Sequence, residues 1–173
     1  MKKVNRIIAS AFCTMLCLAS LCACKVTYSF SGTSIQEDVE TITIEYVEYK
    51  ALKVNPQLSN QMTEALKDKF RKLTKLEQLD EEGDLNLHCE IIGYDVQATA
   101  ITADEQAAQN RLTVNVKVEF TNKKHSEDDF EKNFSAYADF DATQLLDSVQ
   151  DTLCEEIVEK LVEDIFNASV AQW

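Results

Sequence analysis

The chain has 173 residues, with 30 Asp or Glu against 17 Lys or Arg, so its formal net charge at pH 7 is −13. This acidity, without patches that interleave basic and aromatic residues, argues against a nucleic-acid partner. The 3 glycines are too few for a glycine-rich phosphate loop. A chain of this length can bury one modest hydrophobic core, and we therefore expect a single folded domain.

The first residues have the pattern of a bacterial lipoprotein leader. A basic head precedes an apolar run over residues 7–21, which is shorter than the roughly 20 residues that a membrane-spanning helix needs. The run ends in Leu21-Cys22-Ala23-Cys24, which resembles a lipobox with Cys24 as the acylated cysteine. Cys22 fits less well, because the residue directly before it would then be Leu21.

These features set the expected boundaries. We predict a signal peptide over residues 1–23, a lipidated N-terminus and tether over residues 24–39, and one domain over residues 40–173. Cleavage would remove 3 of the 17 basic residues and none of the 30 acidic ones, which leaves a net charge of −16. The clustered cysteines of the leader have no His, Asp or Glu beside them, so we predict no metal site there.

Two elements are predicted in the first part of the domain. Residues 41–46 alternate in strand periodicity, which would place Tyr46 on the same apolar face as the two isoleucines before it. Asn55-Pro56 is typical of a helix N-terminus, and apolar residues at helical spacing from 58 to 73 predict four to five turns.

Three strands are predicted next, after the turn at residues 80–84. The first begins at Leu85 and changes its buried parity at Gly93, as a β-bulge would. Residues 111–121 alternate most clearly, and a hairpin connection leads to a last strand over residues 130–140.

A long helix is predicted at the end of the chain. Asp141 with Gln144 resembles a capping box, and an apolar stripe at four-residue spacing runs from Leu145 to Ile165. The order β-α-β-β-β-α predicts an α+β, two-layer sandwich, with both helices on one face of a mostly antiparallel four-stranded sheet.

No catalytic residue, cofactor or metal site is predicted, so we expect a protein that is not an enzyme. His88 should lie on the polar face of its strand, opposite Cys89, and His125 is the other histidine. The acidic turn at residues 80–84 lacks a calcium loop's final bidentate Glu, since Ile91 occupies that place. We interpret the Glu155, Glu159 and Glu163 stripe as an exposed helix face.

Cys89 and Cys154 both fall on core-facing positions. They could form a disulfide in an exported protein if their Cα atoms lie within about 7 Å, or remain two buried free thiols. A thiol-based redox enzyme, a further hypothesis, would require one of them to be exposed and to have a depressed pKa.

Four strings resemble the Bacteroidota branch of the lipopolysaccharide-assembly lipoproteins, the LptE-like family: TYSFSGTSI, NRLTVNVKVEFTN, FSAYADF and LVEDIFNASVAQW. The resemblance extends from Cys24 to Trp173. It implies an outer-membrane lipoprotein on the periplasmic side, anchored through diacylglycerol and palmitate. It also implies two helices against a four-stranded sheet, plugging and helping to assemble the β-barrel LptD, which places lipopolysaccharide in the outer leaflet.

Lipopolysaccharide is anionic, as this domain is, so direct binding would need basic residues. The candidates are Lys67, Lys69, Arg71, Lys72, Lys75, Lys123 and Lys124. Those on the helix could instead simply complement its dipole. The alternative function is a periplasm-facing lipoprotein that binds a small ligand or an envelope glycan on the same scaffold.

Overall fold

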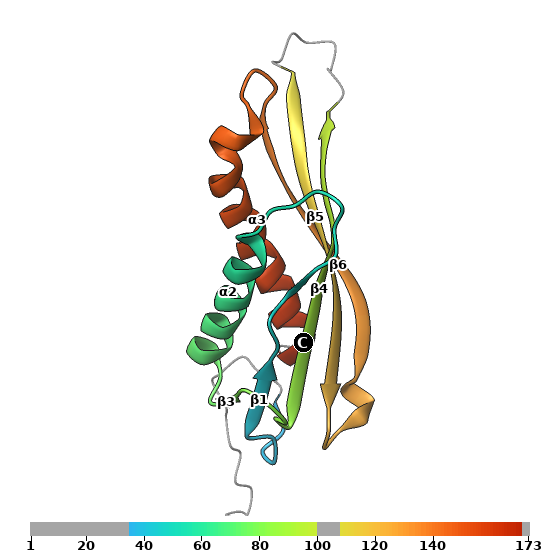
Figure 1. Cartoon of the computed structure of the whole chain (residues 1–173). Coiled ribbons are helices and arrows are strands. Elements are labelled where there is room, and N and C mark those ends of the chain that lie inside the picture. Colours follow the sequence, from blue (N-terminus) through green and yellow to red (C-terminus); the bar gives the residue numbers. More distant parts are fainter. Residues whose placement is uncertain (1–34, 100–107, 171–173) are drawn as a thin grey trace, which may run out of the picture. The chain divides into compact units, whose positions relative to one another are not determined.

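The computed structural model describes residues 35–99 and 108–170, shown in Figure 1. The predicted signal peptide, the lipobox and Cys24 lie outside the described residues, as does most of the predicted tether. The chain divides into two units, Met1–Phe30 and Ser31–Trp173, and the described residues all belong to the second.

The second unit is an α+β fold with one mixed sheet. Its elements are β1 (Thr41–Ile44), β2 (Glu48–Tyr49), α2 (Leu58–Leu73), β3 (Glu77–Leu79), β4 (Leu85–Ala98), β5 (Gln109–Asn122), the 3-10 turn η2 (Ser126–Asp128), β6 (Phe130–Asp141) and α3 (Leu146–Val170). The strand order is β3-β1-β4-β5-β6, and β2 pairs with β4 beyond the end of β1. The pairs β1–β3, β1–β4 and β2–β4 are parallel, whereas β4, β5 and β6 form an antiparallel meander.

The predicted sheet of four mostly antiparallel strands is therefore wrong in strand number, in order and in part of its pairing. The sheet has 6 strands, because β2 and β3 add to the four that were predicted. These two strands have 2 and 3 residues, too few for an alternating pattern to be recognised. The parallel pairing of β1 with β4 arises because the chain crosses over through α2 before it returns to the sheet.

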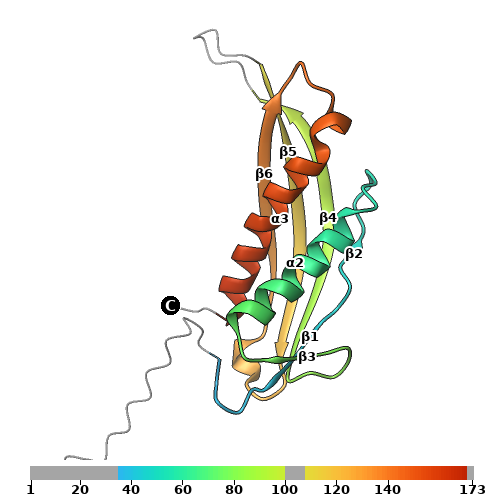
Figure 2. The same cartoon turned by 90° about the vertical axis from the view of Figure 1, so that its left-hand side faces the viewer.

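Both helices cover the same face of the sheet, as predicted, and Figures 1 and 2 show them as one layer. Their buried stripes meet the inward side chains of the strands in one core. Phe70 of α2 and Phe166 of α3 pack edge to face, with ring centroids 5.0 Å apart. Such an aromatic pair adds about 0.5–1.5 kcal/mol beyond the area it buries, and here it fixes one helix against the other.

The start of α2 differs slightly from the prediction. Asn55 is buried, and its side-chain oxygen accepts the backbone N–H of Gln57 at 3.2 Å, while its carbonyl accepts that of Leu58 at 3.3 Å. Asn55-Pro56 thus forms a turn that leads into the helix, and the helix itself begins at Leu58.

The predicted capping box at α3 is wrong. Asp141 is the last residue of β6, and its carboxylate accepts the backbone N–H of Thr143 at 2.8 Å within the connecting turn. The helix begins only at Leu146, and Leu145 is 78% exposed instead of belonging to the buried stripe. Tyr46 is likewise 59% exposed, because β1 ends at Ile44 and the alternation does not continue through it.

The predicted bulge in β4 is confirmed. The register of β4 against β5 shifts between Ile91 and Gly93, and the buried position moves from odd to even residues at Tyr94. A Cβ at Gly93 would lie 2.7 Å from the side-chain nitrogen of Asn115 on β5, so any larger residue there would force the Asn115 side chain to move.

Candidate functional site

The basic residues proposed for lipopolysaccharide contact come from two segments at one end of the sheet. These segments are the C-terminal part of α2 with its following loop, and the connection between β5 and β6 (Figures 1 and 2). The structure brings the two segments to the same end of the domain, although about 50 residues of sequence separate them.

Three of the four basic side chains of α2 form ion pairs with carboxylates. Arg71 and Lys72 both pair with Asp68, at 2.9 and 2.8 Å. Lys69 forms an ion pair with Glu163 of α3, and its ammonium lies 5.7 Å from the centroid of the Phe166 ring. Lys69 therefore stabilises the helix layer. Asp68 offsets only one of the two charges of Arg71 and Lys72, and these exposed ion pairs are weak.

The β5–β6 connection contains one paired and one unpaired lysine. Lys124 pairs with Asp84 at 3.2 Å and also donates to the backbone carbonyl of Asp38. Lys123 is exposed and, like Lys67 and Lys75 of the α2 segment, forms no ion pair within residues 35–99 and 108–170. Of the seven candidates, these three are the ones without an ion-pair partner in that part of the chain.

The helices form an open groove between them that does not resemble a ligand pocket for an apolar molecule. Its lining residues are Gln57, Gln61, Ala65, Asp68, Lys69, Lys72, Asp151, Thr152, Glu155, Val158, Glu159 and Val162. Side chains fill the space between helices and sheet, where Leu66, Ile157 and Leu161 are 0% exposed. This filled core gives no support to the alternative of a small ligand bound between the two layers.

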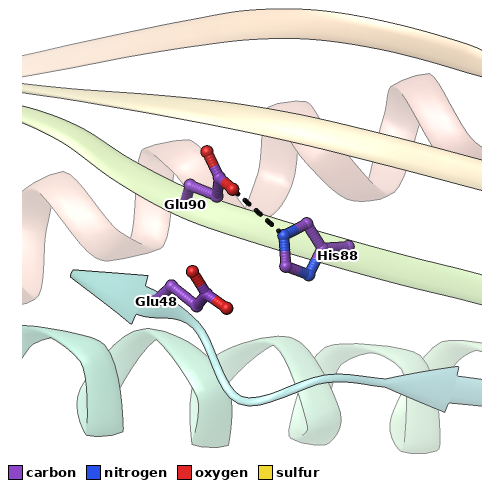
Figure 3. A group of neighbouring side chains, drawn as sticks. All are labelled: Glu48, His88 and Glu90. Atoms are coloured by element: carbon purple, nitrogen blue, oxygen red, sulfur yellow. Dashed lines mark hydrogen bonds and ion pairs between the residues drawn. The ribbon is translucent and has the colours of Figure 1, made fainter. Parts of the chain in front are cut away.

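The outer face of the sheet bears a cluster of charged side chains that we name the His88 cluster: Glu45, Glu48, Lys50, His88 and Glu90. Glu48 and Glu90 are register partners on the parallel strands β2 and β4, and His88 lies two residues before Glu90 on the same face. Figure 3 shows the imidazole beside the two carboxylates, with its contact to Glu90 dashed. His88 Nδ1 lies 2.8 Å from Glu45, and Nε2 lies 3.3 Å from Glu90.

Lys50 completes the cluster, 3.0 Å from Glu48 and in an ion pair with Glu90. The Lys50 and His88 side chains hold the pKa of Glu90 below its usual value. Partial burial lowers the pKa of His88, but the hydrogen bonds to Glu45 and Glu90 outweigh that effect, so its pKa is raised.

His88 lies on the polar face of β4 and Cys89 is buried on the opposite face, as predicted from the sequence. The cluster around His88 was not predicted. The cluster depends on the pairing of the two-residue strand β2 with β4, about 40 positions further along the chain. The one local signal was Glu48 and Lys50, two residues apart, which share a face of an extended segment.

The remaining candidate positions have structural partners. His125 lies 2.9 Å from Asp38, and the Asp84 carboxylate of the acidic turn accepts the backbone N–H groups of Glu40 and Thr41. Cys89 and Cys154 are both free thiols in the core. Burial raises the pKa of Cys89 to about 12 and also raises that of Cys154, whose sulfur accepts a hydrogen bond from Asn55 at 3.4 Å.

Residues 39–169 match the family described as LptE: Lipopolysaccharide-assembly. No curated protein matches the chain in sequence. None of the helices that the structure describes is long and apolar enough to cross a membrane.

Three solved structures share part of the architecture at very low sequence identity. The hypothetical protein CT253 from Chlamydia trachomatis is 11% identical, with a TM-score of 0.49, over 73% of this chain and 93% of that one. A minor lipoprotein from Acinetobacter baumannii is 9% identical, with a TM-score of 0.43, over 73% of this chain and 89% of that one. The uncharacterized lipoprotein B from Nitrosomonas europaea is 12% identical, with a TM-score of 0.43, over 76% of this chain and 85% of that one. The family match, and not these similarities, assigns the chain.

Proposed function

Because this chain belongs to the LptE family of lipopolysaccharide-assembly proteins, we propose that it is a lipid-anchored, non-catalytic component of the lipopolysaccharide translocon. In this role it plugs the outer-membrane β-barrel LptD and assists its assembly. The family match over residues 39–169 carries the proposal, since it includes nearly all of the folded domain.

The surface of the domain suits the inside of a barrel. Lumens of outer-membrane barrels are polar, and a plug must present polar groups to them. The outward side chains of β5, which pairs with β4 and β6, are polar or charged: Arg111, Thr113, Asn115, Lys117 and Glu119. The apolar side chains face the two helices instead, in a filled core.

Acylation at Cys24 would hold the domain at the periplasmic side of the outer membrane. The matched region begins at residue 39, so residues 24–38 would connect the acyl chains to the folded part. Two or more acyl chains provide a stable anchor without a spanning helix.

Lipopolysaccharide contact would use the unpaired lysines Lys67, Lys75 and Lys123. Phosphates on the lipid are anionic, and an ammonium group that already pairs with a carboxylate contributes little to binding them. The ion-paired residues Lys69, Arg71, Lys72 and Lys124 would contribute less to lipid binding.

Affinity purification of the full-length lipoprotein from native outer membranes tests the main proposal. We expect a large β-barrel to co-purify in mild detergent, and isolation of the lipoprotein alone as a monomer would contradict the proposal. In membrane fractionation, Cys24→Ser should release the protein from the outer membrane, whereas the matched variant Cys22→Ser should leave it attached.

A separate experiment tests the lipid contact. Combined Lys67→Glu, Lys75→Glu and Lys123→Glu should reduce binding of purified lipopolysaccharide at least tenfold. The control is Lys53→Glu, another exposed lysine, in the loop before α2. Each of the three substitutions made singly should lower the affinity more than this control, which changes the charge by the same amount. Equal losses in the single variants and the control would mean that only net charge matters and would remove the assignment of these three residues.

A further inference from the structure

The His88 cluster has the donor set of a transition-metal site. Within residues 35–99 and 108–170, Glu48, His88 and Glu90 form the one group whose three ligand atoms all lie within 4.8 Å of one another. Adjacent strands of the sheet hold all three, so their backbones are fixed relative to one another (Figure 3). One imidazole with two carboxylates is a set that zinc and its first-row neighbours accept.

The distance between His88 and Glu90 matches that expected between two zinc ligands. With bonds of about 2.0–2.1 Å, tetrahedral ligand atoms lie about 3.3–3.4 Å apart. His88 Nε2 and the nearer oxygen of Glu90 are separated by 3.3 Å. All three ligand atoms lie within 4.8 Å of one another, so Glu48 needs to move closer by at most about 1.5 Å to complete such a set. Its side chain is 52% exposed and is held by the ion pair with Lys50, which metal binding would replace.

Glu45 prepares the imidazole for this role. Its carboxylate lies 2.8 Å from Nδ1 of His88, so it can accept the proton of that nitrogen. The tautomer that places hydrogen on Nδ1 leaves a lone pair on Nε2, which faces Glu90 and Glu48. A carboxylate behind a metal-binding histidine is the usual way in which proteins fix ring orientation and raise ligand basicity.

The position between the carboxylates already accommodates a cation. The ammonium of Lys50 pairs with both Glu48 and Glu90. With neutral imidazole, the three carboxylates and one ammonium leave a local charge of −2, which a divalent ion would neutralise. Because the Lys50 side chain is 50% exposed, its ion pairs are weak and can be exchanged for metal coordination while the ammonium moves into solvent.

The groups that face the cluster from the next strand do not block it. Glu119 and Lys117 of β5 are the register partners of His88 and Glu90. Lys117 is paired with Glu131 of β6 at 2.9 Å, which directs its charge away from the cluster. Glu119 adds a further carboxylate on the same face.

We propose that Glu48, His88 and Glu90 bind a divalent first-row metal ion, zinc foremost, on the outer face of the sheet, with Glu45 positioning His88 and Lys50 occupying the position when metal is scarce. Water would supply the fourth ligand, and no reaction is implied. The site is independent of the translocon role. In a barrel lumen, bound metal would neutralise the local charge of −2 at this point of the polar face.

Isothermal titration of ZnCl2 into the full chain in detergent, at pH 7.5 and without chelator, tests the proposal. We expect one site whose affinity falls at least a hundredfold in His88→Gln and in Glu90→Gln. Glu45→Gln should weaken binding about tenfold to a hundredfold, as loss of an outer partner usually does. Lys50→Met should tighten binding, because it removes the competing ammonium.

His125→Gln is the matched control, since His125 is the other histidine of the domain and also lies beside a carboxylate. It should leave zinc binding unchanged, and circular dichroism should show that every variant is folded. Co²⁺ should give a visible absorption band that is absent in His88→Gln. Zinc binding that His88→Gln leaves intact, or no binding to the unmodified chain at millimolar zinc, would overturn the proposal.

Discussion

Asp84 and Thr41 exchange two hydrogen bonds where β1 and β4 begin. The Asp84 carboxylate accepts the backbone N–H of Thr41 at 3.1 Å, and the backbone N–H of Asp84 donates to the hydroxyl of Thr41 at 2.8 Å. The same carboxylate accepts the N–H of Glu40 at 3.0 Å and pairs with Lys124. One side chain therefore satisfies the unpaired backbone donors at the start of a parallel strand pair and joins it to the β5–β6 connection.

The first prediction concerns the charge of Asp84. Hydrogen bonds lower the pKa of Asp84 to about 2. The backbone N–H of Glu40 contributes most, and the hydrogen bonds from Thr41 and Lys124 add to its effect. A carboxyl group whose pKa is lower in the folded than in the unfolded chain stabilises the fold at pH values above its pKa in the unfolded chain. That stabilisation is lost as the pH falls through about 2. Asp84→Asn should therefore lower the free energy of unfolding by about 2 kcal/mol at pH 7.

Urea unfolding at a series of pH values measures this effect. The difference between Asp84→Asn and the unmodified protein should be constant from pH 7 to pH 5 and should shrink below the usual carboxylate range. Asp80→Asn, at an exposed residue of the same turn, should change stability by less than about 0.5 kcal/mol. Equal losses in the two variants would show that the paired environment of Asp84 is not the cause.

The second prediction concerns Gly83, directly before Asp84. A Cβ at this position would lie 2.7 Å from the backbone nitrogen of Thr43 and 2.9 Å from the carbonyl oxygen of Leu85, neither of which can move without disturbing the sheet. Gly83→Ala should destabilise the protein by about 1–3 kcal/mol in urea unfolding.

Glu82, directly before Gly83, provides a matched control in which the change of free energy should not be destabilising. Glu82 has a φ of 59°, a left-handed conformation that glycine adopts more easily. Glu82→Gly should therefore leave the free energy of unfolding unchanged or raise it by up to about 1 kcal/mol. Stability that Gly83→Ala leaves unaffected would contradict the close approach of β1 to this turn.

Features that depend only on residues close together in the sequence could be predicted, and features that depend on distant strands could not. β5 alternates over its whole length and the Gly93 bulge changes parity within one strand, so both could be predicted from neighbouring residues. The strands β2 and β3 exist only because a longer strand lies beside them, and no local pattern marks them. The His88 cluster could not be predicted either, because it forms across the β2–β4 pair. Tyr46 and Leu145 were misassigned because periodicity does not show where the backbone leaves an element.

The third prediction concerns His125 and Asp38. The hydrogen bond that His125 Nε2 donates to the Asp38 carboxylate, at 2.9 Å, is the main cause that raises the pKa of His125. NMR titration of the imidazole should give a pKa above the usual value of about 6.5, and Asp38→Asn should return it toward that value. Glu127→Gln should have a smaller effect, because its carboxylate lies 3.7 Å from the ring. A larger shift in Glu127→Gln than in Asp38→Asn would contradict this assignment.

The last prediction concerns the two core thiols. Cys89 and Cys154 are each 1% exposed, and burial raises the pKa of both, so little reactive thiolate forms at neutral pH. Iodoacetamide at pH 8 should label neither cysteine in the folded protein and both in urea, as peptide mass spectrometry can show. Ser126→Cys, at an exposed residue of η2, provides a positive control that should react within minutes under the same conditions. Rapid labelling of either native thiol would revive the redox hypothesis, and a Cys89–Cys154 peptide in the unreduced digest would show that export oxidises the pair.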